Sequence, residues 1–284
     1  MVSVPHWRIF RESVQGPGKA GNQDWYDAEG TAEGNLVLAV ADGHGSAVHS
    51  RSGLGARFAV DIFMRCAREF AARAGETPGN LRQLRHDACR RVPREVVRDW
   101  QDEVHRHLKD HPLAGVTRGD ELLPYGTTLL GAVCVPGLVV AWQLGDGDLM
   151  LVEADGTISA PLAPSEPELG DETESLCSRQ AWDLMRVHWA PVSDPGRLPR
   201  LLMLSTDGLS KSFAAQDGFV RFVREVSERL AAEGPEAIGA ALPGWLARAS
   251  TYSGDDTTVA AVWRRPDDPD PSEDGSQDRE TEND

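Results

Sequence analysis

Residues 35–43 read NLVLAVADG, a nearly unbroken apolar run that ends in an Asp-Gly pair. An apolar run of this length is typical of a strand that is buried on both faces of its sheet. Two further apolar runs end in the same dipeptide, and a fourth run follows an Asp-Asp pair. The positions are Asp42-Gly43, Asp146-Gly147, Asp207-Gly208 and Asp255-Asp256. The sequence thus repeats one pattern, an apolar strand with aspartate at its end.

An Asp-Gly pair on its own indicates a turn, because aspartate caps the turn and glycine accepts a positive φ. Four pairs together favour another interpretation. Strand ends in layered sheets converge on one edge, where carboxylates without matching cations repel one another. Hard oxygen donors without Cys or clustered His favour Mg²⁺ or Mn²⁺ over Zn²⁺. Two such ions about 3.5–4 Å apart activate water for in-line displacement at phosphorus. The residues alone therefore predict a two-metal phosphohydrolase and leave its substrate open.

The rest of the chain predicts an α+β fold. Amphipathic helices are expected at 48–73 and 80–109, the second interrupted near Pro93 because proline lacks a backbone donor. Strands are expected at 127–135, 138–144, 149–153, 183–189, 201–205 and 257–263, and helices at 219–232 and 236–248. Strands near both ends of the chain, with two long helices inserted early, predict one domain of sheets covered by helices.

Composition and charge exclude several classes of function. No stretch reaches the roughly 18 apolar residues of a membrane span, and the N-terminus lacks the apolar run of a signal peptide, so we expect a cytoplasmic protein that does not bind membranes.

Residues 265–284 carry −7 of the formal net charge of −16, which leaves −9 for the domain at 1–264. An acidic body disfavours nucleic-acid binding. The terminal stretch lacks apolar residues and predicts a disordered acidic tail.

Six short motifs are spread along the chain in a fixed order. They are GKAGNQD at 18–24, VADGHGS at 40–46, GTT at 126–128, LGDGD at 144–148, STDGL at 205–209 and GDDTTV at 254–259. With these motifs the chain resembles the metal-dependent type-2C (PPM) protein phosphatases over roughly residues 13–264, and the first two look most like the bacterial branch. The resemblance implies a four-layer α-β-β-α sandwich in which helices flank two central antiparallel sheets.

The resemblance also implies a set of metal ligands. In that family the position of Asp42 bridges two ions, and the carbonyl at Gly43 binds the second ion. Asp207 and Asp255 fall on the positions that bind the first ion. Asp24 falls on the acidic position in the shell of the second. The expected cofactors are two Mn²⁺ or Mg²⁺ ions.

Three more positions carry expectations from the same resemblance. Asp146 is implied to help bind a third, weaker ion, although Gly147-Asp148 follows it where the family commonly has Ser or Arg. Lys19 stands where the family usually has the arginine that holds the substrate phosphate, and lysine keeps the charge without the bidentate fork. His44 is implied to protonate the leaving alkoxide, a role that suits an imidazole of near-neutral pKa, and the alternative is a partly exposed surface histidine.

The implied reaction is hydrolysis of phosphoserine and phosphothreonine by in-line attack of a metal-bridging hydroxide. The expected partner is a phosphorylated protein, a Ser/Thr kinase or its target, and the expected state is a monomer. Two alternatives stay open. One is a two-metal phosphohydrolase of small phosphate esters, against which the six ordered motifs argue. The other is a non-catalytic scaffold, which should have lost metal ligands that this sequence retains.

Overall fold

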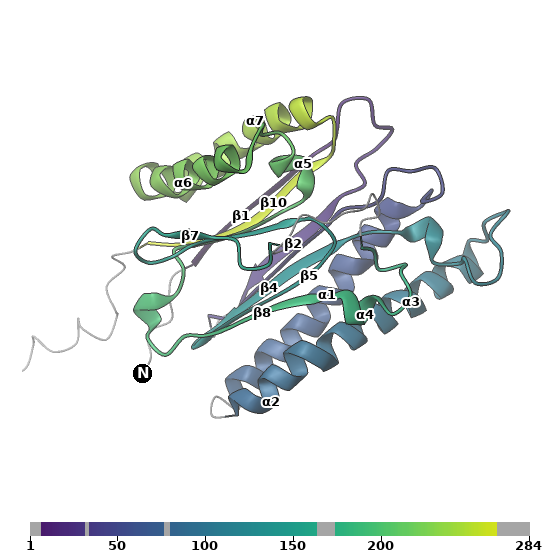
Figure 1. Ribbon diagram of the computed structural model, residues 1–284, viewed down its shortest axis with the longest axis horizontal. Helices are drawn as coiled ribbons and strands as arrows, with labels where there is room; N and C mark the ends of the chain where they lie inside the picture. Colours follow the sequence, from purple (N-terminus) through teal and green to yellow (C-terminus); the bar gives the residue numbers. More distant parts are fainter. Residues whose placement is uncertain (1–6, 32–33, 77–79, 164–173, 266–284) are drawn as a thin grey trace, which may run out of the picture.

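The computed structural model describes residues 7–31, 34–76, 80–163 and 174–265 (Figure 1). Two five-stranded antiparallel sheets lie at the centre, and helices cover the outer face of each. These four layers confirm the expected α-β-β-α sandwich. The predicted acidic tail at 265–284 lies outside the described residues, apart from Arg265.

The first sheet brings the two ends of the described chain together. Its strands, in spatial order, are β1 (Trp7–Val14), β10 (Thr257–Arg264), β9 (Leu201–Ser205), β6 (Asp148–Val152) and β7 (Ile158–Ser159). β1 and β10 pair along their whole length, from Trp7 opposite Arg264 to Val14 opposite Thr257. The segment before β10 and the segment after β1 therefore lie side by side, beyond the same end of these two strands.

The second sheet contains the strand that opens the sequence pattern. Its order is β2 (Trp25–Gly30), β3 (Leu36–Ala41), β4 (Leu129–Val135), β5 (Leu138–Leu144) and β8 (Arg186–Pro191). Each pair of neighbouring strands in this sheet is antiparallel. β3 lies inside the sheet, between β2 and β4, as its apolar sequence predicts.

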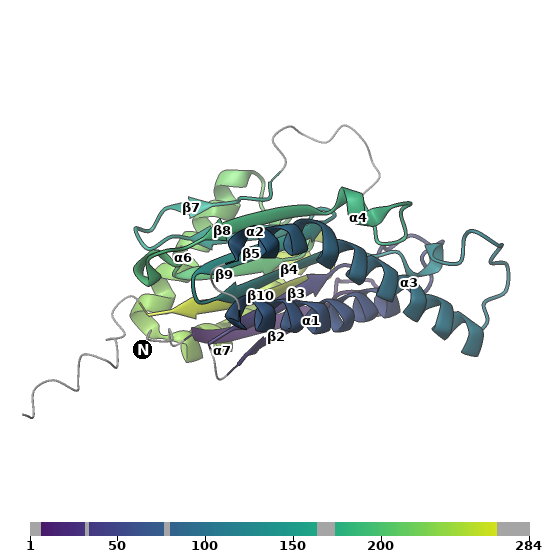
Figure 2. The same cartoon turned by 90° about the horizontal axis from the view of Figure 1, so that it is seen from below.

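Two groups of helices close the sandwich. The helices over the second sheet are α1 (Ser52–Glu76), α2 (Leu81–His86), the π-helical segment η1 (Asp87–Arg91) and α3 (Val92–Asp110), and Figure 2 shows them crossing its outer face. Those over the first sheet are α6 (Gln216–Glu233) and α7 (Pro235–Ser253). The short helical segments are η2 (Leu123–Tyr125), α4 (Ala181–Leu184), η3 (Pro195–Arg197) and α5 (Asp207–Ser210).

The apolar strands are unbroken because both faces of each sheet are buried. Along β3, Val37, Ala39 and Ala41 belong to the core under α1. Leu38 and Val40 belong to a separate core between the two sheets. Successive side chains of a strand point to opposite faces, so a strand between two cores needs apolar residues at every position.

The structure differs from the sequence prediction at polar strands and at one helix break. β1 and β2 were not predicted, because each lies at a sheet edge and has one buried hydrophobic residue, Phe10 in β1 and Ala28 in β2. The strand predicted at 183–189 begins at Arg186, since residues 181–184 are helical. The break predicted near Pro93 falls just before it, in η1, because proline is tolerated in the first turn of α3.

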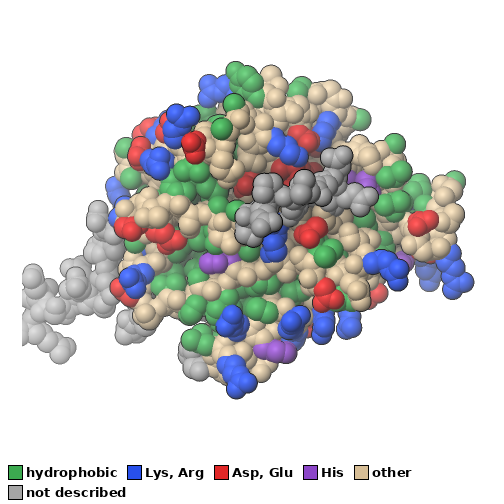
Figure 3. All heavy atoms as spheres, viewed as in Figure 1, with side chains coloured by type: hydrophobic (Ala, Val, Ile, Leu, Met, Phe, Trp, Pro, Cys, Tyr) green, Lys and Arg blue, Asp and Glu red, His purple; other side chains and the backbone are tan. Residues whose placement is uncertain are grey.

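The basic side chains of this acidic chain are unevenly placed. Figure 3 shows Lys and Arg gathered along the lower edge of the visible face, over α2 and α3. The exposed arginines of that helical stretch are Arg82, Arg85, Arg90, Arg91, Arg94 and Arg98. Within the described parts of the chain, no helix is both long and apolar enough to cross a bilayer.

Candidate functional site

The predicted aspartates meet at one edge of the sandwich because the strands that carry them are antiparallel neighbours. In the second sheet, Trp25 at the start of β2 pairs with Ala41 at the end of β3, so Asp24 and Asp42 leave the sheet side by side. In the first sheet, the last residue of β9 pairs with both Asp148 and Val259, so the segments at Asp146, Asp207 and Asp255 share an edge.

Asp42 is the common member of this carboxylate group. Burial raises the pKa of Asp42 well above its usual value, and the charges of Asp24, Asp207 and Asp255 raise it further. Thr128 fixes its backbone, accepting from Asp42 N at 3.0 Å through Oγ1 and donating to Asp42 O at 2.9 Å through its amide. The three other predicted ligands therefore lie close enough to Asp42 for their charges to act on it.

Asp24 lies deepest, between the two sheets' strand ends. Its Oδ2 accepts hydrogen bonds from Thr206 Oγ1 at 2.8 Å and Thr258 Oγ1 at 2.6 Å. Its Oδ1 is buried and has no hydrogen-bond partner among the described residues. Burial, aided by the charges of Asp256 and Asp207, raises the pKa of Asp24 to about 7. Such a carboxylate holds either a proton or a cation.

Asp255 and Asp256 have different roles, although they are adjacent in the sequence. Asp256 is fully buried and accepts from Gly16 N at 2.7 Å and from Gln23 N at 2.8 Å, so it anchors the loop before β2. Asp255 is half-buried and faces the carboxylate group. Sequence reasoning assigned the metal to Asp255, and the structure provides the reason that Asp256 is less suited.

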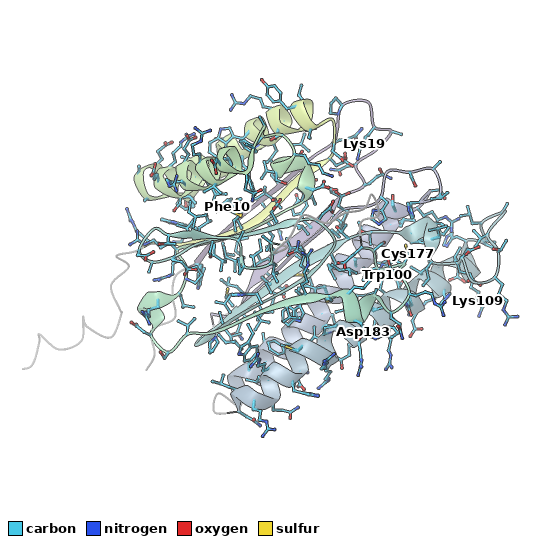
Figure 4. All side chains as sticks on the ribbon, viewed as in Figure 1. Phe10, Lys19, Trp100, Lys109, Cys177 and Asp183 are labelled. Atoms are coloured by element: carbon cyan, nitrogen blue, oxygen red, sulfur yellow. The ribbon has the colours of Figure 1, made fainter. Side chains whose placement is uncertain are left out.

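Lys19 belongs to this edge, where Figure 4 labels it. Its ammonium contacts Asp255 and lies 3.4 Å from Asp256 Oδ2. Burial alone would lower the pKa of Lys19, but the hydrogen bond and charge of Asp255, with the charge of Asp256, raise it overall. Lys19 is therefore a firmly charged cation beside the predicted ligands.

Asp207 is paired with a lysine that the sequence motifs do not include. Asp207 starts α5, and its Oδ2 forms an ion pair with Lys211. Its Oδ1 is buried and has no hydrogen-bond partner in the described part of the chain. Burial and the nearby charge of Asp146 raise the pKa of Asp207 to about 6.

His44 is less basic than the sequence analysis expects. Burial lowers the pKa of His44 to about 4, and the neighbouring ring of His49, 4.8 Å away between centroids, lowers it as well. The backbone of His44 is held by Gly126 O at 3.1 Å. At neutral pH the imidazole is uncharged, and any cation bound nearby would lower its pKa further.

The glycines of the Asp-Gly pairs are required by packing and not by turn geometry. Neither Gly43 nor Gly208 has a positive φ. A Cβ on Gly208 would lie 1.9 Å from Asp256 O, and one on Gly43 would lie 2.7 Å from Gln23 O. These glycines let the segments that carry the aspartates approach one another, so the turn interpretation does not account for them.

The residues at this edge suit hard divalent ions. The Oδ1 atoms of Asp24 and Asp207 are buried and have no hydrogen-bond partner among the described residues, so each carboxylate must be neutralised there by a proton or by a cation. Over the described residues, no three carboxylate, imidazole or thiolate side chains are arranged as a ready metal-binding cluster. Asp207 and Asp255 are each paired with a lysine in this structure, Lys211 and Lys19. Lys211 contacts Oδ2 of Asp207, and the Oδ1 atom has no hydrogen-bond partner in the part of the chain that the structure describes. The donor set is all oxygen, which fits Mg²⁺ or Mn²⁺.

Four contributing side chains have no assigned role in the sequence analysis. They are Thr206, Thr258, Asp256 and Lys211. Thr206 and Thr258 border strands and face Asp24, a pairing that depends on the β9–β10 register. Lys211 does carry a sequence signal, because it stands four residues after Asp207 and such pairs meet on a helical turn.

Comparison with known proteins gives one family and one fold. The family model for protein phosphatase 2C matches residues 18–247. The match includes the first five motifs and ends before the sixth, so Asp255 lies outside it. No curated protein matches the chain in sequence.

Several solved structures share the fold. A bacterial serine phosphatase is 14% identical, with a TM-score of 0.60 over 92% of this chain and 98% of that one. The serine/threonine phosphatase PstP/Ppp of Mycobacterium tuberculosis is 17% identical, with a TM-score of 0.56 over 91% and 99%. Stp1 of Staphylococcus aureus is 15% identical, with a TM-score of 0.57 over 93% and 96%. At these identities the likeness concerns the fold alone.

The close approach at Gly208 predicts a position-specific effect of alanine. Gly208→Ala is expected to lower the free energy of unfolding by about 1–3 kcal/mol or more, which is the typical cost of inserting extra atoms into a tightly packed site. The matched control is Gly239→Ala in α7, where an added Cβ meets nothing within 4 Å. That control is expected to raise stability by about 0.5–1 kcal/mol, because alanine is the better helix former. Equal stabilities in chemical denaturation would contradict this packing.

The raised carboxylate pKa values predict a pH dependence that metal removes. In chelator, the neutral form of Asp24 is favoured by folding, with a pKa of about 7 against about 3.9 when unfolded. Its contribution to stability is complete below about pH 4 and is lost as the pH rises through 7. The Tm should therefore rise as the pH falls from about 8 to 6.

Metal should replace the proton as the neutralising charge. Mn²⁺ at 100-fold above its Kd is expected to stabilise the protein by about 2.7 kcal/mol and to flatten this pH dependence. Asp24→Asn should weaken the pH dependence without metal, and the raised pKa values of Asp42 and Asp207 should account for what remains. The carboxylate group would not be the metal site if the Tm in chelator fell as the pH was lowered from 8 to 6, or if Mn²⁺ did not change the Tm at pH 8.

Proposed function

The chain belongs to the protein phosphatase 2C family, a class of protein-serine/threonine phosphatases, and we propose that it hydrolyses phosphoserine and phosphothreonine in proteins with Mn²⁺ or Mg²⁺ as cofactor. The observation that carries the proposal is the group of buried and half-buried aspartates at one edge of the sandwich. Two of them, Asp24 and Asp207, have a buried oxygen without a hydrogen-bond partner among the described residues. The resemblance of the sequence motifs to those of the family implies ligands at these same positions, which supports the proposal. A non-catalytic scaffold would have no reason to keep so unfavourable a cluster.

The proposed ligands are divided between the two sheets. Asp24, Asp42 and the carbonyl of Gly43 come from the second sheet, and Asp207 and Asp255 come from the first. When bound, a pair of divalent ions supplies an activated water for in-line displacement at phosphorus. The chain's own contribution is to position these residues: Thr128 fixes the backbone of Asp42, and Thr206 donates a hydrogen bond to the carboxylate of Asp24.

Lys19 is proposed to orient the phosphoryl group. Its ammonium lies at the rim of the carboxylate group, held by Asp255 and Asp256. An incoming phosphate dianion meets a positive charge there, which offsets its repulsion from the aspartates. Lysine acts as a point charge, so it attracts the phosphate without the fixed angle of an arginine fork.

His44 is proposed to position groups near the leaving oxygen and not to protonate it. An imidazole with a pKa of about 4 is uncharged at neutral pH, so the imidazolium form that would act as the acid is nearly absent. It can still accept or donate a neutral hydrogen bond. The proton on the departing serine or threonine oxygen then comes from water.

The proposed substrate is a phosphorylated protein, with a Ser/Thr kinase or the target of one as the expected partner. We also propose that the enzyme is cytoplasmic and monomeric. Small phosphate esters are the competing substrates, since the same ions and lysine would act on them. The preference is measured by comparing kcat/KM for a phosphothreonine peptide and for a small aryl phosphate.

The function is tested by phosphate release from a phosphothreonine peptide, with Mn²⁺, with Mg²⁺ and with chelator. Release is expected only with metal, and Asp42→Asn should lower kcat at least about 100-fold, the scale of removing one charge-stabilising group. Asp183→Asn is the matched control, because Asp183 is an exposed acid on α4, apart from the edge with Lys19 (Figure 4). Metal-independent release, or equal activity of the two variants, would overturn the proposal.

The role of His44 has its own test. Loss of a general acid lowers turnover by about 100-fold or more. His44→Gln, which keeps a hydrogen-bonding side chain, should lower kcat at pH 7 by far less than that. The alkaline limb of its kcat profile should match that of the unaltered protein. A 100-fold loss together with a missing limb would make His44 the acid after all.

A further inference from the structure

Lysine is rare in this chain, and its placement is selective. Of the 29 basic side chains, only Lys19, Lys109 and Lys211 are lysines, and the others are arginines. Lys19 and Lys211 both contact the carboxylate group. Lys109 lies at the end of α3, away from Lys19 (Figure 4). A chain that uses arginine nearly everywhere thus uses lysine at its cluster of acids.

Lys211 lies between two of the aspartates that the family motifs identify. Its ammonium pairs with Asp207 Oδ2 and lies 3.8 Å from Asp146 Oδ2. Its backbone amide donates to Asp207 O at 2.8 Å, which holds the lysine at the end of α5. The charge of Lys211 also reaches Asp148, whose side chain is turned into the protein with Oδ2 partnerless among the described residues.

An ammonium is the side-chain group that most resembles a small bound ion. It is a compact point charge, whereas a guanidinium is a wide planar fork. Asp146 is also the residue that the family resemblance assigns to a third, weaker ion. A lysine tethered four residues from Asp207 therefore supplies positive charge at the place where that third ion would supply it.

We propose that Lys211 stands in for the third divalent ion, so that the chain binds a pair of ions at Asp24, Asp42, Asp207 and Asp255 and none at Asp146. The inference rests on the proposed metal-dependent function and deepens it. With a pair of ions bound, Asp207 would offer its Oδ1 atom to an ion, and Lys211 would remain beside Asp146. The Asp146 carboxylate is then neutralised at every metal concentration, without an ion that dissociates.

The test is a count of bound Mn²⁺ on the full chain, by equilibrium dialysis and titration calorimetry, with no substrate present. Lys211→Gln removes the charge at nearly constant size and is expected to bind one more Mn²⁺ per chain than the unaltered protein. Lys211→Arg keeps a charge and should bind no more than the unaltered protein. Lys109→Gln removes the same charge from the end of α3 and should leave the count unchanged. Each variant is first shown to unfold cooperatively in chelator.

A second variant assigns the extra ion. Lys211→Gln combined with Asp146→Asn should lose the additional Mn²⁺ and return to the count of the unaltered protein. Equal counts and affinities for the unaltered protein and Lys211→Gln would overturn the role of Lys211 while leaving the metal pair intact. An unaltered protein that itself binds the additional ion at Asp146 would overturn it too. No Mn²⁺ binding by any form would contradict the proposed function and this inference with it.

Discussion

The repulsion between buried like charges is the constraint on which the rest of this structure depends. Carboxylates that lose their water need protons or cations, and a group of them in one place is stable only when neutralised. Burial raises the pKa values of Asp24, Asp42 and Asp207, and the charges of neighbouring carboxylates raise them further. Lys19 and Lys211 meet part of the demand within the chain. The remainder is the charge that the proposed divalent ions would neutralise.

The sandwich makes this arrangement possible because the aspartates lie beyond the strands' apolar residues, outside the cores. Three separate apolar cores hold the sheets and helices, and none of them includes the carboxylate edge. The unfavourable charges can therefore be held in place by packing elsewhere. Threonines at strand ends and the buried Asp256 then fix the loops against the sheets. Stability and chemistry occupy different parts of the same strands.

The sequence was informative where a residue's neighbours in the chain decide its environment. The apolar run before Asp42 predicted a central strand, and the recurring Asp positions predicted a shared edge. β1 and β2 escaped prediction, because edge strands need little apolar sequence. The bonds of Thr206 and Thr258 to Asp24 depend on strand register, which no local pattern specifies. The low pKa of His44 likewise depends on burial and on His49, which only the folded chain determines.

The anchoring of the loop before β2 by Asp256 has a consequence for the order of events during translation. Gly16 and Gln23 are made early, but the carboxylate that accepts from their amides is 240 residues away from Gly16 along the chain. Lys19 and Asp24 lie in that loop or directly after it. A growing polypeptide therefore exposes these residues on the ribosome long before their partner emerges. Contacts of such separation form late in folding, so no catalytic centre is assembled until almost the whole domain has been synthesised.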